Sequence, residues 1–135
     1  MSHTALLVVF LLFAGICHSQ DIIPTKGKEF WVGFMENFWE GTNESLELFV
    51  TSNVGTTGTV TIPQQGWSQS FTVSANSTTS INIPNAIAEH YQNQLIEDRG
   101  IFVETQDTVS VFAVNVETFT ADATKVLPVQ ALGTE

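Results

Sequence analysis

Few residues in this chain could support covalent catalysis, and the first candidate is a serine. The segment Gly66-Trp67-Ser68-Gln69-Ser70 comes within one residue of the G-x-S-x-G nucleophile motif, whose final glycine is here a serine. That motif works where a strand feeds a helix, because the sharp turn between them exposes the serine hydroxyl. Ser68 instead follows a turn and begins a predicted strand. We therefore interpret it as a polar strand position.

The second candidate is His90, the only imidazole after residue 20. A serine hydrolase would need it as the general base. No serine motif accompanies it, and the sequence places it on the polar side of a predicted short helix. We expect a surface histidine that acts simply as a solvated base.

Carboxylate pairs are the third candidate. Glu44 with Glu47, or Glu36 with Glu40, could in principle carry out glycoside hydrolysis, which needs two acids about 5–9.5 Å apart. The chain has 14 acidic residues, so close pairs arise by chance. Nothing in the sequence predicts the burial that would separate two carboxyl pKa values. The sequence therefore predicts a protein that is not an enzyme.

No cofactor or metal is predicted, with calcium left as an open alternative. Asp98, Glu104, Asp107 and Asp122 could supply oxygen ligands for calcium, but no D-x-[DN]-x-[DN]-G loop is present. Cys17 is the only cysteine, which leaves no cysteine-based zinc site and no disulfide.

Three tryptophans could contact a ligand, since an indole is a rigid apolar platform with a polar edge. Trp31 lies inside a continuous apolar run, so we expect it in the core. Trp39 lies beside a loop and Trp67 follows a turn, which makes these two the candidates for ligand contact. The competing interpretation is that both rings fill or cover the core.

Two asparagines fit the N-glycosylation pattern N-x-[ST]. They are Asn43, in Asn43-Glu44-Ser45, and Asn76, in Asn76-Ser77-Thr78. Glycosylation at either site is conditional on a eukaryotic secretory route.

The charge balance excludes several partners. The chain of 135 residues has 4 Lys and Arg against 14 Asp and Glu, a formal charge of −10. Nucleic acid and anionic lipid are poor partners, because both need clustered basic residues. Mutual repulsion favours a monomer, or one part of a larger multidomain protein.

The first residues predict export. Residues 5–17 form an uncharged apolar run of thirteen, too short to span a membrane but typical of a signal peptide. We expect residues 1–19 to be the signal peptide, with cleavage between Ser19 and Gln20. Residues 20–135 would then be one secreted, extracellular or cell-surface domain that does not insert into the membrane.

The remaining chain alternates between apolar and polar residues with a period of two, which indicates strands buried on one face. The apolar positions that share a face within each run are Leu46, Leu48 and Val50; Val60 and Ile62; Phe71 and Val73; Ile81 and Ile83; and Ile101 and Val103.

Two runs, residues 30–35 and 109–116, are apolar on both faces and predict central strands. Turns are expected at 53–55, 63–66 and 106–107. One short helix is expected near residues 85–95, with Asn85 as its cap. Together these features predict an all-β, sandwich-like antiparallel domain. An apolar strand-like segment at 123–132, close to Glu135, suggests that this domain is incomplete at its C-terminal end.

Three blocks of sequence resemble the amino-terminal domain of the IgG Fc-binding protein family. They are GKEFWVGFMEN at 27–37; TGTV at 57–60 with Gly66-Trp67; and residues 114–135, which include TFTADA, Leu127-Pro128 and ALGTE. The family name comes from a mucin-associated secreted protein. The resemblance therefore implies a secreted or surface-exposed, non-enzymatic adhesion or recognition module.

Immunoglobulin binding does not follow from this resemblance, because no residue here matches a transferable binding motif. The expected ligand is an extracellular protein or glycan. The alternative is a carbohydrate-binding β-sandwich module that uses its exposed tryptophans, Trp39 and Trp67.

Overall fold

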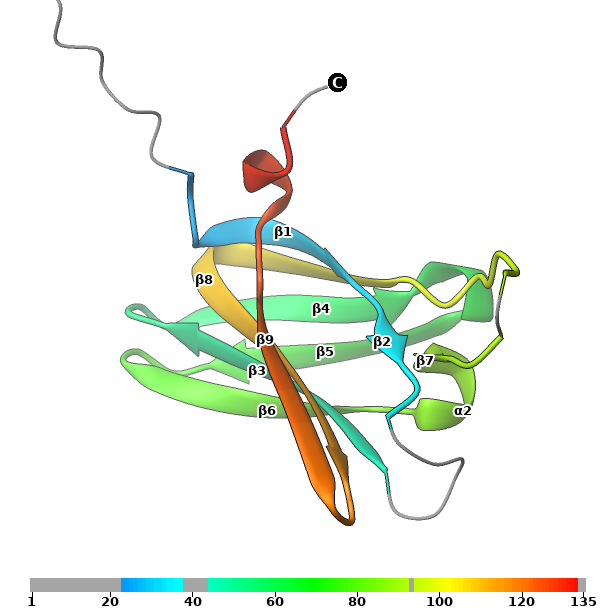
Figure 1. Cartoon of the computed structure of the whole chain (residues 1–135). Coiled ribbons are helices and arrows are strands. Elements are labelled where there is room, and N and C mark those ends of the chain that lie inside the picture. Colours follow the sequence, from blue (N-terminus) through cyan, green and yellow to red (C-terminus); the bar gives the residue numbers. More distant parts are fainter. Residues whose placement is uncertain (1–22, 38–43, 93, 134–135) are drawn as a thin grey trace, which may run out of the picture.

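A computed structural model describes residues 23–37, 44–92 and 94–133 and shows an all-β domain (Figure 1). The predicted fold class is confirmed: most of the described residues lie in strands, the pairing is mostly antiparallel, and the only α-helix in the described part is short. The strands are β1 (Gly27–Val32), β2 (Phe34–Met35), β3 (Ser45–Ser52), β4 (Thr56–Ile62), β5 (Trp67–Val73), β6 (Ser77–Ile83), β7 (Glu89–His90), β8 (Ile101–Glu117) and β9 (Thr120–Val126). The helical elements are η1 (Pro63–Gln65), α2 (Asn85–Ala88) and η2 (Val129–Ala131).

Strand β8 belongs to two sheets. Its first part pairs with β1 and β4, and its second part pairs with β3 and β9. Strand β5 extends one sheet from β4, and β6 extends the other from β3. We call β5-β4-β8-β1 the first sheet and β6-β3-β8-β9 the second sheet. Figure 1 shows β8 curving as it passes from one sheet to the other.

The curve in β8 falls where the sequence predicts a turn, at residues 106–107. The register with β1 shifts here, since Glu29 pairs with Glu104 while Gly27 pairs with Val109. The backbone N–H of Asp107 donates to the Thr56 hydroxyl (3.0 Å), and the Thr105 hydroxyl donates to the Asp107 carbonyl (2.8 Å). These side chains replace missing ladder hydrogen bonds, so the strand bends instead of ending. The predicted turn is therefore wrong, whereas those at 53–55 and 63–66 are confirmed.

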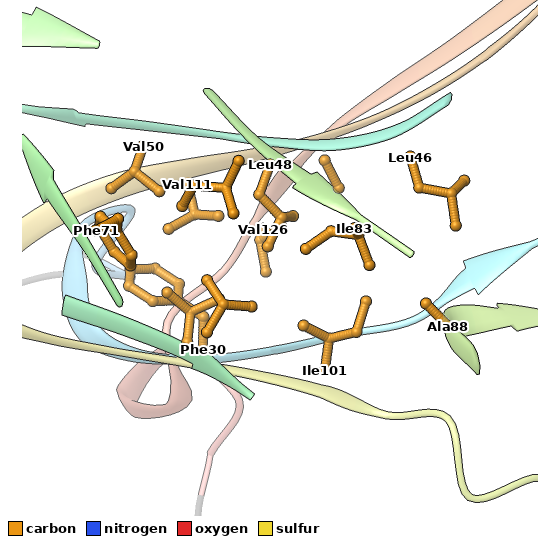
Figure 2. Packing of buried hydrophobic residues seen from close by; sticks show 14 of the residues in the cluster. Phe30, Leu46, Leu48, Val50, Phe71, Ile83, Ala88, Ile101, Val111 and Val126 are labelled. Carbon is orange, nitrogen blue, oxygen red and sulfur yellow. The ribbon is translucent and has the colours of Figure 1, made fainter. Parts of the chain in front are cut away.

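The core lies between the two sheets. Figure 2 shows labelled side chains from both sheets pointing toward one another, among them Phe30, Val50 and Val111. Every apolar position that the alternation pattern assigned to a buried face is buried. Gly58 brings β4 close to β8, because an added Cβ would lie 2.5 Å from the Glu104 carbonyl oxygen and from the Phe71 ring. Period-two patterning therefore predicts the inward faces correctly.

The two runs predicted as central strands have different outcomes. Residues 109–116 lie within β8, which pairs on both sides, so that prediction is confirmed. Residues 30–35 are split at Gly33 between β1 and β2; β1 pairs with β8 along its length and has one further bridge, from Phe30 to Pro128. The expectation that Trp31 is a core residue is wrong: it is 50% exposed, because Phe30 takes the inward position and the next residue must point outward.

The predicted helix is present as α2 but ends at Ala88. Glu89 has extended backbone (φ −80°, ψ 130°) and leads into β7, which pairs in parallel with β2. Asn85 does not cap the helix; its side-chain amide donates to the Glu44 carbonyl (2.6 Å). The helix ends at Ala88 because the next two residues pair with β2 as a strand.

Neighbouring residues in β1 provide a matched test of this burial pattern. Phe30→Ala should cost about 3–5 kcal/mol of unfolding free energy, because it removes a fully buried ring. Trp31→Ala removes a larger but half-exposed ring and should cost about 1 kcal/mol or less. Urea denaturation measures both. Equal losses would contradict the assignment of inner and outer faces.

Candidate functional site

The outer side of the first sheet carries eight side chains in two rows across its strands. In the first row, Trp31 pairs with Phe102, Phe102 with Thr61, and Thr61 with Ser68. In the second row, Glu29 pairs with Glu104, Glu104 with Thr59, and Thr59 with Ser70. All eight are exposed or half-buried. We call this set the Trp31 face.

Trp31 and Phe102 form an aromatic pair on this face. Their ring centroids lie 4.8 Å apart with an angle of 38° between the ring planes. Gly100 lies against the indole, since a Cβ built there would be 3.5 Å from Cζ3 of Trp31. The indole is therefore held in a defined orientation while 50% of the residue stays accessible. Such a ring is a ready platform for a ligand.

Glu29 and Glu104 face each other directly across β1 and β8. Among the described residues, the ion pairs involve Glu97 and not these two carboxylates. The nearby Lys28 ammonium instead donates to the Gln106 carbonyl (2.6 Å). Like charges opposite each other destabilise a sheet by about 0.2–1 kcal/mol. The Trp31 face thus carries an exposed aromatic ring and two acidic residues at paired positions, and such departures from folding rules often mark functional sites.

A shallow, open hollow of about 470 Å³ adjoins this row of carboxylates. Its polar lining comes from Thr57, Thr59, Ser70, Thr72, Glu104 and Gln106. Hydroxyl groups both donate and accept hydrogen bonds, while carboxylates only accept. The lining of the hollow therefore presents both donors and acceptors of hydrogen bonds at the surface.

Of the two tryptophans predicted from sequence to contact a ligand, the structure describes Trp67. Trp67 pairs with Ile62 and packs half-buried against the core, and its contact with a ligand stays a prediction. Trp39 and Asn43 lie outside the described residues. Asn76 is exposed in the turn before β6, with a left-handed φ of 56° that asparagine tolerates. Its glycosylation stays a prediction.

A second group of side chains gathers where β2 meets β7; we call it the Glu89 cluster. Its members are Glu36, Glu44, Glu89, His90, Glu97 and Arg99. His90 is half-buried in β7 rather than on a helix, and its Nδ1 lies 3.6 Å from the Glu97 carboxylate. Arg99 pairs with Glu97 (3.0 Å) and lies 4.7 Å above the centre of the Tyr91 ring.

Burial raises the pKa of Glu89 from 4.5 to about 7, and a side-chain hydrogen bond with Glu44 adds to this shift. Repulsion from Glu44 and Glu36 acts in the same direction, while Arg99 opposes it. A carboxyl that keeps its proton near neutral pH resembles a general acid. However, the carboxyl group of Glu89 is already hydrogen-bonded to another side chain of the protein, that of Glu44.

Of the two candidate carboxylate pairs, Glu44 with Glu47 lies within the described residues, and each member has its own partner. Glu47 accepts hydrogen bonds from Ser45 (3.2 Å) and Ser80 (2.6 Å), whereas Glu44 contacts Glu89. Glu40 lies outside the described residues. No hydrogen bond joins Ser68 to His90 in the part of the chain that the structure describes.

The possible calcium ligands are similarly dispersed. Within residues 23–37, 44–92 and 94–133, no group of three or more His, Cys, Asp or Glu side chains is arranged to hold a metal ion. Glu104 belongs to the Trp31 face, Asp107 to the bend of β8, and Asp122 to the edge strand β9.

Comparison of the chain with protein-family models, curated proteins and solved structures found no match. The resemblance to the IgG Fc-binding family therefore stays a prediction. No helix in the described residues is both long and apolar enough to cross a membrane.

The raised pKa of Glu89 predicts a stability change with pH. Its folded pKa of about 7 exceeds the unfolded value of 4.5, so its stabilising contribution is complete below pH 4.5 and is lost as the pH rises to 7. Glu89→Gln stays neutral and should be more stable than the natural protein at pH 8, by about 1 kcal/mol after solvent screening. Urea denaturation at pH 5 and pH 8 measures the difference. Asp98→Asn, at an exposed site, is the control, and an equal pH dependence in both variants would refute the assignment.

Proposed function

We propose that this chain is a non-enzymatic binding module that acts outside the cell, either secreted or at the cell surface. It contacts an extracellular protein or glycan through the Trp31 face. The observation that carries the proposal is the half-exposed indole of Trp31, held in place by Phe102 and Gly100. Binding energy at such surfaces concentrates in a few aromatic anchors.

The shape of the Trp31 face supports binding rather than turnover. It is a broad sheet surface with a shallow hollow, and its polar groups are hydroxyls and carboxylates spread over four strands. A catalyst needs a nucleophile or base within hydrogen-bond distance of its partner. Here Glu29 and Glu104 are both acids, and the ammonium of the nearby Lys28 donates to a backbone carbonyl and not to either carboxylate.

The extracellular setting rests on the sequence. The apolar run at residues 5–17 favours export, and the charge of −10 favours a soluble, non-aggregating surface. The resemblance to the IgG Fc-binding family points to the same setting, in which mucus and cell surfaces present protein and glycan ligands.

Fluorescently labelled protein should bind to mucus-coated epithelial cells, as measured by flow cytometry. Trp31→Ala should weaken this binding by about tenfold or more, the loss expected for an aromatic anchor. The matched control is Phe112→Ala, which removes an aromatic ring that is 37% exposed on the outer side of the second sheet. Equal binding by natural protein and Trp31→Ala, or no binding at all, would refute the proposal.

A further inference from the structure

The chemistry of the Trp31 face points to one class of ligand. We infer that it binds a neutral glycan chain, without sulfate, phosphate or carboxylate groups, laid across β1, β8, β4 and β5. This assignment rests on the proposed function, because it uses the same face. It goes further because it names the class of ligand and the direction in which the glycan lies across the strands.

The aromatic end of the face suits the apolar side of a sugar ring. Trp31 is half-exposed, and its contacts with Phe102 and Gly100 fix its orientation before a ligand arrives. An aromatic side chain has few rotatable bonds, and one already held in place loses little entropy on binding. The sugar ring that stacks here would mark one end of the bound chain.

The polar part of the face suits the hydroxyl groups of the following sugars. From Trp31 the first row continues through Phe102 to the hydroxyls of Thr61 and Ser68, and the second row offers Glu29, Glu104, Thr59 and Ser70 beside it. Three strand spacings of about 4.8 Å make each row roughly 14 Å long, the reach of a short oligosaccharide. Carboxylates accept strong, charge-assisted hydrogen bonds from hydroxyl donors.

The charge of the face decides between ligand classes. Glu29 and Glu104 lie opposite each other without a basic partner among the described residues, so an anionic glycan would be repelled. A protein ligand without basic residues opposite them would have to bury both charges unpaired, which is costly, and protein interface cores are depleted in charged residues. A neutral glycan avoids both costs, because its hydroxyls can solvate the carboxylates.

The test titrates the purified full chain with two neutral probes, cellohexaose and chitohexaose. Tryptophan fluorescence and isothermal calorimetry follow the binding, and an array adds sulfated and sialylated glycans. At least one neutral probe should bind and shift the fluorescence, and Trp31→Ala should weaken that binding about tenfold or more. Trp67→Phe should keep the fluorescence shift, because Trp67 packs against the core.

Glu104→Gln tests the role of charge. The amide keeps an oxygen acceptor but removes one of the two negative charges, so neutral probes should bind a few-fold more weakly while anionic glycans bind better than to the natural protein. Urea denaturation confirms that each variant folds, and Phe112→Ala serves as the control for the opposite sheet.

Three results would overturn the inference: no binding of either neutral probe, a preference for anionic glycans, or binding of a neutral probe that survives Trp31→Ala. The proposed function fails separately. If binding to mucus-coated cells depends on Trp31 but persists after periodate destroys the surface glycans, the ligand is a protein and only the glycan assignment falls. If the cells are not bound at all, the proposed function falls as well.

Discussion

The structure depends on a single strand that is continuous through two sheets. Strand β8 runs from Ile101 to Glu117, and each sheet is built outward from one part of it. The bend between the two parts is possible because Thr56 and Thr105 supply hydrogen bonds where the ladder is interrupted. This arrangement closes a core of aliphatic side chains and Phe rings without disulfides. It also leaves each sheet one outer side, and the first sheet uses that side to present Trp31.

Much of the fold could be predicted from the sequence, because alternation with a period of two reports which side chains face inward. The bend of β8 could not, since Gln106 and Asp107 have the composition of a turn. What keeps the strand continuous is a hydrogen bond from Asp107 to Thr56, a residue 51 positions away. The exposure of Trp31 was predictable in principle: with Phe30 inward, the same alternation places the next residue outward. The apolar run around it favoured the wrong interpretation.

Neither candidate site could be located from the sequence. The Trp31 face exists only once the register of four strands is known, because its residues come from positions 29–31, 59–61, 68–70 and 102–104. The Glu89 cluster depends on the parallel pairing of β2 with β7, which no local pattern indicated. The sequence contains the residue types that form these sites, an excess of acids and three tryptophans. Its pattern of loops and turns, however, favoured Trp39 and Trp67 as the ligand contacts. We propose that the oriented indole of Trp31, beside the carboxylates of Glu29 and Glu104, serves to recognise a hydroxyl-rich ligand.

The most direct test of this account is an NMR titration of the ¹⁵N-labelled protein with a neutral hexasaccharide. We predict that the amide and indole signals that shift will belong to β1, β4, β5 and the first part of β8, with the indole N–H of Trp31 among them. Shifts confined to the Glu89 cluster, or to the outer side of the second sheet around Phe112, would contradict it.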